Sequence, residues 1–394
     1  MTVKKMVEGI HWVGANHLDR RLFDELIPLP EGTSYNAYLV QGSQNTALID
    51  SVLPSKKDEL MKNLDELGVK KIDYVVANHA EQDHSGSIPF VLQRFPECKV
   101  VCNAMCKQML VDFMAIPEDR FLIVTDRQTL SLGDKTLEFV FVPWVHWPET
   151  MFTFVREDNV LFTCDFLGSH SGVTELFAKD DVKTMEAAKR YYAEIMMPFR
   201  QLISRHLQTI AQINPRIVAT SHGPAYDNPG WITNAYDDWV NKAPKNEAVI
   251  AYVSMYGSTA KAVERLANSL FKQGVVVKQF NLTKTDLGEL AIALVDAGTI
   301  VLATPTVLGG PHPSAAHAAI VVNALKPKAR FVSIICAYEW GGKTVDVLKS
   351  LLPQLKAELL EPVSIKGAPT EKDFQAIDGL AQKIVGKHLE NAFK

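Results

Sequence analysis

The sequence predicts two consecutive domains, an α+β domain over residues 1–246 and an α/β domain over residues 247–394 with a doubly wound, five-stranded parallel sheet. Three observations predict this division. The 394 residues exceed the length of about 150 that is usual for one domain. Strand-like and helical patterns alternate regularly only in the last third of the chain. A polar segment with a proline, residues 241–247, separates the two patterns and places the boundary near residue 246.

The C-terminal pattern contains five strand–helix units in order. The first strand is expected at 248–254 and the first helix at 258–274, with Ser258 or Thr259 near its N-cap and Gly274 after its end. Such alternation predicts a parallel sheet with helices on both faces. The remaining expected strands are 275–282, 299–306, 330–338 and 360–367, and the remaining expected helices are 286–298, 314–326, 343–356 and a last one from Glu371.

The N-terminal domain shows more strands than helices. Its clearest helical stretch runs from about Val182 to Gln212. Its expected strands, read from β-branched and aromatic runs, are 34–40, 46–52, 71–79, 99–104, 137–144, 151–155 and 160–165.

Composition and charge exclude several classes of protein. The 41 Lys and Arg against 45 Asp and Glu give a formal charge of −4, which argues against nucleic acid as a partner. With 47% hydrophobic and 22% charged residues, the composition is that of a globular protein. No apolar run approaches the roughly 18 residues of a membrane span. The first residues, which include Glu8, are unlike a secretory signal, so we expect a cytoplasmic protein.

The five cysteines are odd in number and mostly lie in apolar, strand-like runs, which is typical of reduced core thiols. No two of them form a C-x-x-C pair, which argues against a tetrathiolate iron or zinc site. They are Cys98, Cys102, Cys106, Cys164 and Cys336.

Histidine and carboxylate side chains are concentrated directly after one predicted strand, in the segment His79-x-Glu81-x-Asp83-His84. In an extended chain, residues at i, i+2 and i+4 point to one side, so this segment is expected to present several ligands together. Without a metal, so many acidic and imidazole groups would repel each other or lack partners. Three further ligand types follow the ends of other predicted strands: His146, Asp165 and His222. One such residue alone would more often be a turn residue, but the dense cluster predicts a metal site.

This pattern resembles the metallo-β-lactamase superfamily, whose motif is H-x-H-x-D-H and whose sites usually hold zinc. Here Glu81 occupies the position of the second histidine, so the set contains three carboxylates. Oxygen donors suit iron or manganese better than they suit a thiolate-loving metal. Three carboxylates and one hydroxide would also neutralise two ferrous ions, and iron is therefore the expected metal.

Three loops in the second domain follow the first, third and fourth strands. Small and hydroxyl residues between a strand and a helix can bind a phosphate at the helix N-terminus, although the first loop alone could equally be a simple cap. Ligands of doubly wound sheets bind at this edge, and together the loops resemble the FMN-binding loops of flavodoxins. The residues are Ser254, Met255, Tyr256, Gly257, Ser258 and Thr259; Thr304, Pro305, Thr306, Val307, Leu308 and Gly309; and Ala337, Tyr338, Glu339, Trp340, Gly341 and Gly342.

A metallo-β-lactamase-like domain with H-x-E-x-D-H followed by a flavodoxin-like domain resembles the flavodiiron proteins, also called A-type flavoproteins or rubredoxin:oxygen oxidoreductases. The resemblance covers essentially the whole chain and implies an αββα sandwich before the flavodoxin-like sheet. It implies one iron at His79, Glu81 and His146, the other at Asp83 and His222, and Asp165 as the bridge. His84 matches a position that binds iron in some members only, so its role stays open.

The resemblance further implies the reduction of dioxygen to water, of nitric oxide to nitrous oxide, or of both. Tyr191, Tyr192 and Trp147 are candidates to line the gas pocket, as is His84, although the aromatic residues could equally be core residues. Many members carry asparagines in the second flavin loop, where this chain has Leu308, Gly309 and Gly310. Contacts with the flavin ring there are expected from the backbone.

Family members form head-to-tail homodimers, which implies a homodimer or a dimer of dimers here. The missing C-x-x-C pairs imply that electrons come from an external donor, either a rubredoxin-like protein or a reduced deazaflavin coenzyme. Two other interpretations remain: a binuclear metal-dependent hydrolase with an appended flavodoxin-like module, and an electron carrier with a degenerate metal site.

Overall fold

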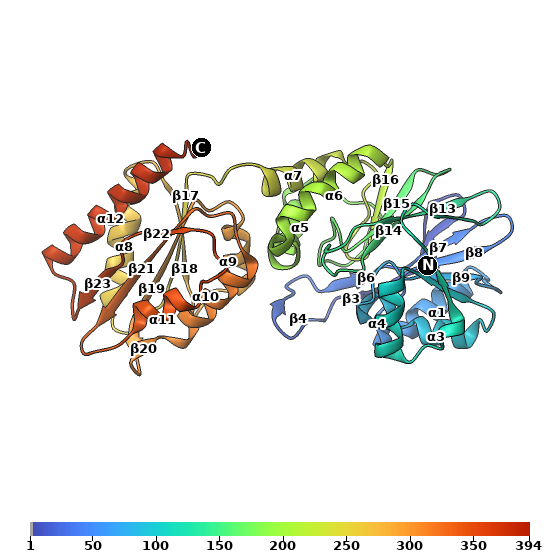
Figure 1. Ribbon diagram of the computed structural model, residues 1–394, viewed down its shortest axis with the longest axis horizontal. Helices are drawn as coiled ribbons and strands as arrows, with labels where there is room; N and C mark the ends of the chain where they lie inside the picture. Colours follow the sequence, from blue (N-terminus) through green and yellow to red (C-terminus); the bar gives the residue numbers. More distant parts are fainter. Residues whose placement is uncertain (1–2) are drawn as a thin grey trace. The chain divides into compact units, whose positions relative to one another are not determined.

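In the computed structural model, which describes residues 3–394, the chain divides into two units. The first unit consists of Met1–Tyr192 and Phe199–Val240, and the second of Ala193–Pro198 and Asn241–Lys394. Figure 1 labels the helices and strands of both units. Within the described residues, no helix combines the length and the apolar character that crossing a membrane requires.

Two β-sheets form the centre of the first unit. The first sheet has the strand order β1-β2-β7-β8-β9-β10-β11: Lys4–Val7, Ile10–Trp12, Tyr38–Gln41, Thr46–Ile49, Tyr74–Val76, Lys99–Cys102 and Phe121–Ile123. The second sheet has the order β12-β13-β14-β15-β16: Thr129–Ser131, Thr136–Phe141, Met151–Val155, Val160–Cys164 and Ile217–Thr220. Two short pairs lie outside these sheets: β3 (Ala15–His17) with β6 (Thr33–Tyr35), and β4 (Leu22–Phe23) with β5 (Ile27–Pro28).

The alternation of side chains along the strands creates two separate cores. In β7, Tyr38 and Val40 pack with Phe139 and Phe162 of the second sheet, so this core lies between the two sheets. Leu39 points the other way and packs with Leu60 of helix α1 (Lys57–Glu66). Together with the helices of the second sheet, this arrangement is the expected αββα sandwich. The other helices of the unit are α2 (Gln82–Ser85), α3 (Ile88–Arg94), α4 (Ala104–Met114), α5 (Val182–Tyr191), α6 (Arg200–Ile213) and α7 (Gly230–Asn241).

The stretch from Val182 to Gln212 is not one continuous helix. Helix α5 ends at Tyr191, a π-helical turn (Tyr192–Met196) and a 3-10 turn (Met197–Phe199) follow, and α6 then begins. Pro198 lies at this break, and a proline in the middle of a helix removes one backbone donor and clashes with the preceding turn.

The second unit is a parallel sheet of five strand positions in the order β18-β17-β19-β21 and then β22 with β23. This is the order of flavodoxin-like doubly wound folds and confirms the predicted fold class. The fifth strand is divided into two short pieces that pair with different parts of β21. The strands are β17 (Glu247–Tyr252), β18 (Val276–Asn281), β19 (Thr299–Val307), β21 (Phe331–Tyr338), β22 (Glu358–Leu359) and β23 (Val363–Lys366).

Helices α8 and α12 share a core on one face of this sheet, where Leu266 and Leu270 pack with Ile377 and Ile384. Helices α9 and α10 contact each other and the sheet (Figure 1). The helices are α8 (Ser258–Phe271), α9 (Leu287–Leu294), α10 (Pro313–Leu325), α11 (Thr344–Ser350) and α12 (Glu371–Glu390).

Candidate functional site

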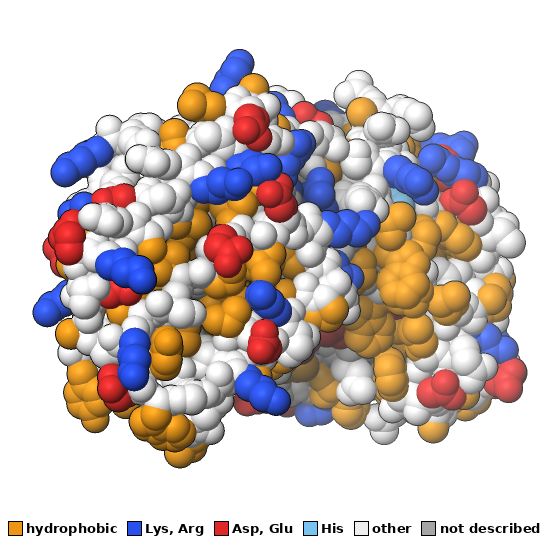
Figure 2. All heavy atoms as spheres, turned by 60° about the vertical axis from the view of Figure 1, so that its left-hand side comes forward, with side chains coloured by type: hydrophobic (Ala, Val, Ile, Leu, Met, Phe, Trp, Pro, Cys, Tyr) orange, Lys and Arg blue, Asp and Glu red, His pale blue; other side chains and the backbone are white. Residues whose placement is uncertain are grey.

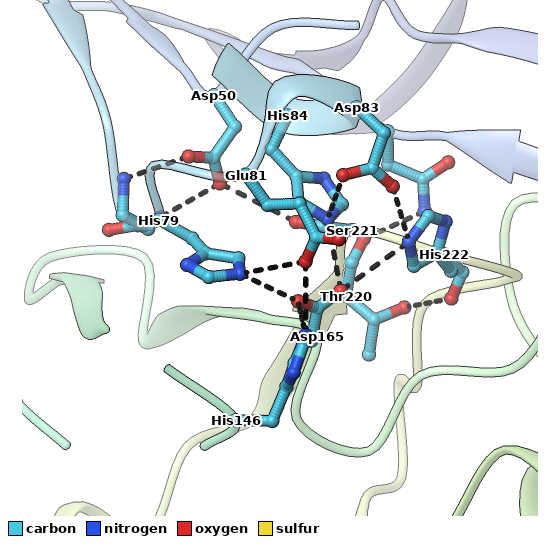
Figure 3. Close-up of polar contacts among 12 residues, drawn as sticks. Asp50, His79, Glu81, Asp83, His84, His146, Asp165, Thr220, Ser221 and His222 are labelled. Atoms are coloured by element: carbon cyan, nitrogen blue, oxygen red, sulfur yellow. Dashed lines mark hydrogen bonds and ion pairs between the residues drawn. The ribbon is translucent and has the colours of Figure 1, made fainter. Parts of the chain in front are cut away.

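The segment from His79 to His84 does not form the extended chain that the sequence suggested. Strand β9 ends at Val76, and Asp83 and His84 lie in the short helix α2. Because the helix turns the chain, the rule that i, i+2 and i+4 point to one side does not apply. His79 and Glu81 contribute to one group of side chains, and Asp83 and His84 to another (Figure 3).

The first group contains His79, Glu81, His146 and Asp165, whose ligating atoms all lie within 4.8 Å of one another. The Oε2 atom of Glu81 lies 3.2 Å from His79 Nε2 and 3.1 Å from His146 Nε2. The same two imidazole nitrogens lie 3.6 Å and 3.4 Å from Asp165 Oδ2. Residues from three loops therefore direct two imidazoles and two carboxylates at one space.

The second group contains Asp83, His84 and His222, again within 4.8 Å. His222 Nε2 lies 3.1 Å from Asp83 Oδ2, and His84 Nε2 lies 3.3 Å from Asp83 Oδ1. The other oxygen of Asp165, Oδ1, lies 3.0 Å from His84 Nε2 and 3.4 Å from His222 Nε2. His84 is thus placed as fully in this group as His222 is.

Asp165 lies between the two groups, with one oxygen directed at each (Figure 3). Several buried polar atoms around it have no hydrogen-bond partner within residues 3–394. Unpaired buried polar atoms are costly, and a shared cation would satisfy them. These atoms are both carboxylate oxygens of Asp83, Nε2 of His84, Nε2 of His222 and Oδ2 of Asp165. Four imidazoles and three carboxylates in two adjoining groups fit a pair of iron ions.

The carboxylates strongly influence the imidazoles. Burial would lower the pKa of His79, but hydrogen bonds to Glu149 and Glu81 raise it to about 10. Hydrogen bonds to Asp165 and Glu81 likewise outweigh the burial of His146 and raise its pKa to about 10. Burial would also lower the pKa of His84, but the charges of Asp83 and Asp165 raise it to about 9. Because a metal binds the neutral imidazole, protons compete with metal for these nitrogens.

Two partners of the ligand residues, and one carboxylate that holds a neighbouring residue, lie behind the site and were not predicted. Glu149 Oε1 accepts a hydrogen bond from His79 Nδ1 at 2.6 Å, and Ser34 O accepts one from His222 Nδ1 at 2.6 Å. Asp50 accepts hydrogen bonds from the backbone N–H and the side-chain amide of Asn78, next to His79. These contacts join residues far apart in the chain. For the contact of Glu149 with His79 the sequence held one local signal, because Glu149 lies three residues after His146.

The aromatic candidates occupy different positions. The Tyr191 hydroxyl donates a hydrogen bond to Asp165 Oδ1 at 2.9 Å. The Trp147 ring packs edge-on against His79, with centroids 4.9 Å apart. Tyr192 instead lies among Tyr236 and Trp239, with centroids 5.2 Å and 5.4 Å away, in the core of the unit. Tyr191 and Trp147 therefore lie at the two groups of candidate metal ligands, and Tyr192 does not.

His170 was not predicted as a site residue, yet its ring lies 4.9 Å from His222 and 4.8 Å from Tyr191. Its Nδ1 lies 3.0 Å from Thr33 Oγ1, and burial holds its pKa well below the usual value, so the imidazole is neutral. Cys164 Sγ also lies within 4.8 Å of ligand atoms of His84 and Asp165. Burial raises the pKa of this thiol well above its usual value, so it stays protonated, as expected of a core cysteine.

The three cofactor loops leave β17, β19 and β21, which are neighbours in the sheet, so the loops meet at one edge. In the first loop, the N-cap of α8 is Gly257 at φ 94°, and Ser258 and Thr259 are the first two residues of the helix. The Ser254 hydroxyl accepts hydrogen bonds from the N–H groups of Gly257 and Ala260, both at 3.2 Å. The other first-turn N–H groups of α8, those of Ser258 and Thr259, have no carbonyl partner within the helix and are available to a phosphate.

The second loop is a tight hairpin between β19 and β20 (Gly310–Pro311) that the sequence analysis missed. Leu308 and Gly309 form its tip at φ 53° and 80°. Thr306 connects this hairpin to the first residue of α11, which follows the third loop: Thr306 Oγ1 lies 2.8 Å from Thr344 Oγ1. Hydrophobic side chains reach the molecular surface in several places between charged ones (Figure 2). One large side chain in each of the three cofactor loops is largely exposed: Tyr256 is 93% exposed, Leu308 97% and Trp340 71%.

Fold and site together define the class of protein. The first domain is β-lactamase-like and contains two adjoining, carboxylate-rich groups of candidate metal ligands. The second domain is flavodoxin-like and has three open cofactor loops. Together they form the architecture of a flavin- and metal-dependent oxidoreductase. Residues 33–223 match the ODP family beta lactamase.

Comparison of the whole chain gives the family. A nitric oxide reductase from Moorella thermoacetica is 34% identical over 392 residues, which cover 97% of this chain and 98% of the relative. A coenzyme F420H2 oxidase from Methanothermobacter marburgensis is 29% identical over 98% of both chains. The solved rubredoxin oxygen:oxidoreductase from Desulfovibrio gigas superposes with a TM-score of 0.93 at 27% identity, over 98% of both chains. The chain belongs to the flavodiiron protein family, whose members carry FMN and a non-haem diiron site.

Proposed function

We propose that this protein reduces dioxygen to water, nitric oxide to nitrous oxide, or both, at a diiron centre that receives electrons through FMN. Reduction of dioxygen to two water molecules consumes four electrons and four protons. Reduction of two nitric oxide molecules to nitrous oxide and water consumes two electrons and two protons. A ferrous pair supplies two electrons and reduced FMN supplies two more, so the two cofactors together hold enough for either reaction.

The arrangement of Asp165 is the observation that carries this proposal. Its two oxygens lie between two groups of ligand residues, at 3.4 Å from His146 on one side and 3.4 Å from His222 on the other. A carboxylate in this position can bridge two irons. Glu81 in the first group replaces a neutral imidazole by an oxygen donor, which favours iron over the zinc of a hydrolase.

The residues have the following proposed roles. One iron would be held by His79, Glu81 and His146, and the other by Asp83, His222 and His84, because His84 Nε2 lies 3.0 Å from Asp165 and 3.3 Å from Asp83. FMN would be bound by residues 254–259, 304–309 and 337–342, with Trp340 and Tyr256 available to the ring. The diiron domain would comprise residues 1–246 and the FMN domain residues 247–394.

Protein side chains near Asp165 would control protons at the reacting gas. Burial raises the pKa of Tyr191 well above its usual value, so its hydroxyl remains a donor, and it donates to Asp165 Oδ1. His170 is neutral, and Nε2 of its ring has no hydrogen-bond partner within the described residues. Trp147 packs against His79 and would exclude water from that side of the first group.

Electrons would come from an external donor, a rubredoxin-like protein or a reduced deazaflavin coenzyme, as the names of relatives suggest. The protein would act in the cytoplasm as a head-to-tail homodimer or a dimer of dimers. Its five buried, free cysteines support a reducing compartment. Full turnover by a strictly monomeric preparation would contradict the dimer.

Metal and flavin analysis followed by stopped-flow oxidation tests the function. We expect two irons and one FMN per chain, and rapid oxidation of the fully reduced protein by at least one of the two gases. Zinc without flavin would instead indicate the hydrolase, and flavin without metal the electron carrier. Comparing the rates with dioxygen and nitric oxide then identifies the preferred gas.

A further inference from the structure

Glu149 is a fully buried carboxylate two residues before the start of β14, and it belongs to neither group of candidate metal ligands. Its Oε1 accepts hydrogen bonds from His79 Nδ1 at 2.6 Å and from the backbone N–H of Ala80 at 2.9 Å. Its backbone carbonyl accepts one from Asn103, the N-cap of α4, at 2.5 Å. The carboxylate is thus fixed from two sides against His79.

The remote nitrogens of the other imidazoles have different surroundings. His222 Nδ1 donates to a neutral group, the carbonyl of Ser34. His84 Nδ1 has no hydrogen-bond partner among residues 3–394. The described ion pairs of His146 are made by Nε2, towards Glu81 and Asp165. Within the part of the chain that the structure describes, a carboxylate therefore backs His79 alone.

We propose that Glu149 is a positioning residue that makes the two iron positions inequivalent. It fixes His79 with the proton on Nδ1 and Nε2 free for the metal, and it places a carboxylate in direct hydrogen-bond contact with an imidazole of the first group. This inference rests on the proposed diiron function and concerns how that centre is tuned.

The physical consequence follows from charge. A carboxylate hydrogen-bonded to the remote nitrogen of a metal-binding histidine orients the ring and increases the basicity of the ligand. Ser34 O can orient His222 but brings no net charge. The iron held by His79 should therefore leave more slowly, and it should be the one that prefers the ferric state in a mixed-valent pair.

The test uses full-length, iron- and FMN-loaded protein, with Glu149→Gln as the variant. Glutamine keeps the shape and one accepting oxygen but removes the charge. Loaded protein is challenged with an iron chelator under anaerobic conditions, and iron release is followed over time. We expect the variant to release one of its two irons about 10- to 100-fold faster than the wild type and the other at the wild-type rate. EPR-monitored titration should show the mixed-valent signal appearing at a higher potential.

Glu138→Gln is the matched control, because Glu138 is a mostly buried glutamate of the same unit that pairs with Arg127 and Arg156 instead. It should release both irons as the wild type does. Glu149→Asp, which keeps the charge, should release iron more slowly than Glu149→Gln. Equal acceleration of both irons, no acceleration, or equal release by Glu149→Asp and Glu149→Gln would overturn the inference. Failure of the wild type itself to hold two irons would overturn the proposed function.

Discussion

The hydroxyl of Tyr191 donates a 2.9 Å hydrogen bond to Asp165, the carboxylate that lies between the two groups of candidate metal ligands. The bond is buried, and the oxygen that accepts it is Oδ1, which also faces His84 and His222. A donor at this position lowers the negative charge that Asp165 offers to the second group. Among the described contacts of Asp165, it is the hydrogen bond that a hydroxyl group donates.

Tyr191→Phe should therefore lower the rate of gas reduction about tenfold while iron and FMN contents stay constant. A hydrogen bond to a charged group is worth about 1.5–3 kcal/mol, so its loss is large enough for such an effect. Stopped-flow oxidation of the reduced variant by each gas measures the change. Tyr192→Phe is the control, because its ring lies among Tyr236 and Trp239 and its hydroxyl does not contact Asp165. Equal rates for both variants would show that the Tyr191 hydroxyl has no part in the reaction.

Asp165→Asn should abolish gas reduction and reduce the iron content, while the FMN remains reducible. The amide removes one of the three carboxylate charges and cannot bridge two irons as a carboxylate does. Iron analysis, the flavin spectrum and anaerobic photoreduction measure the three properties. Wild-type reduction of dioxygen by this variant would refute the bridging role of Asp165.

Ser254→Ala should weaken FMN binding about three- to tenfold. The Ser254 hydroxyl accepts two hydrogen bonds that hold the first loop, from Gly257 and Ala260, and each contributes about 0.5–1.5 kcal/mol. Fluorescence titration of the apoprotein with FMN measures the affinity. Ser350→Ala, on the surface at the end of α11, should leave it unchanged. An unchanged affinity in Ser254→Ala would mean that the first loop keeps its form without this hydroxyl.

The candidate ligand residues could be selected from the sequence because they lie after the ends of strands, which meet at the rim of a sheet, and the structure brings them into two groups, although their binding of iron stays a prediction. The sequence could not show how His79 and Asp83 diverge, because that depends on the short helix α2. Tyr191 and Tyr192 could not be distinguished, since neighbouring residues of a helix point about 100° apart and nothing local shows which side faces the site.

Contacts over long distances in the chain were not predicted where no ligand pattern pointed to them. Glu149 meets His79 across 70 residues, and His170 meets Thr33 across 137 residues. The shortest strands, such as β4, β5 and β20, also escaped, because two residues carry no periodic pattern. The parallel sheet of the second unit was predicted most completely, since its central strands β17, β19 and β21 are mostly apolar and buried.

Acidification should destabilise the second unit through His388. Burial lowers the pKa of this histidine to about 4, against about 6.5 in an unfolded chain. The neutral ring accepts a hydrogen bond from Thr299 at 2.7 Å and donates one to Asn246 at 2.8 Å. Between pH 6.5 and 4 the unfolded chain binds a proton that the folded chain does not, so the free energy of unfolding falls as the pH falls through this range.

Urea unfolding followed by FMN fluorescence measures this free energy of unfolding at each pH. His388→Gln should be less stable than the wild type at pH 8, and the difference should shrink towards pH 4. His317→Gln, at an exposed position of α10, should follow the wild type, and a difference between wild type and His388→Gln that stays constant with pH would contradict the assignment.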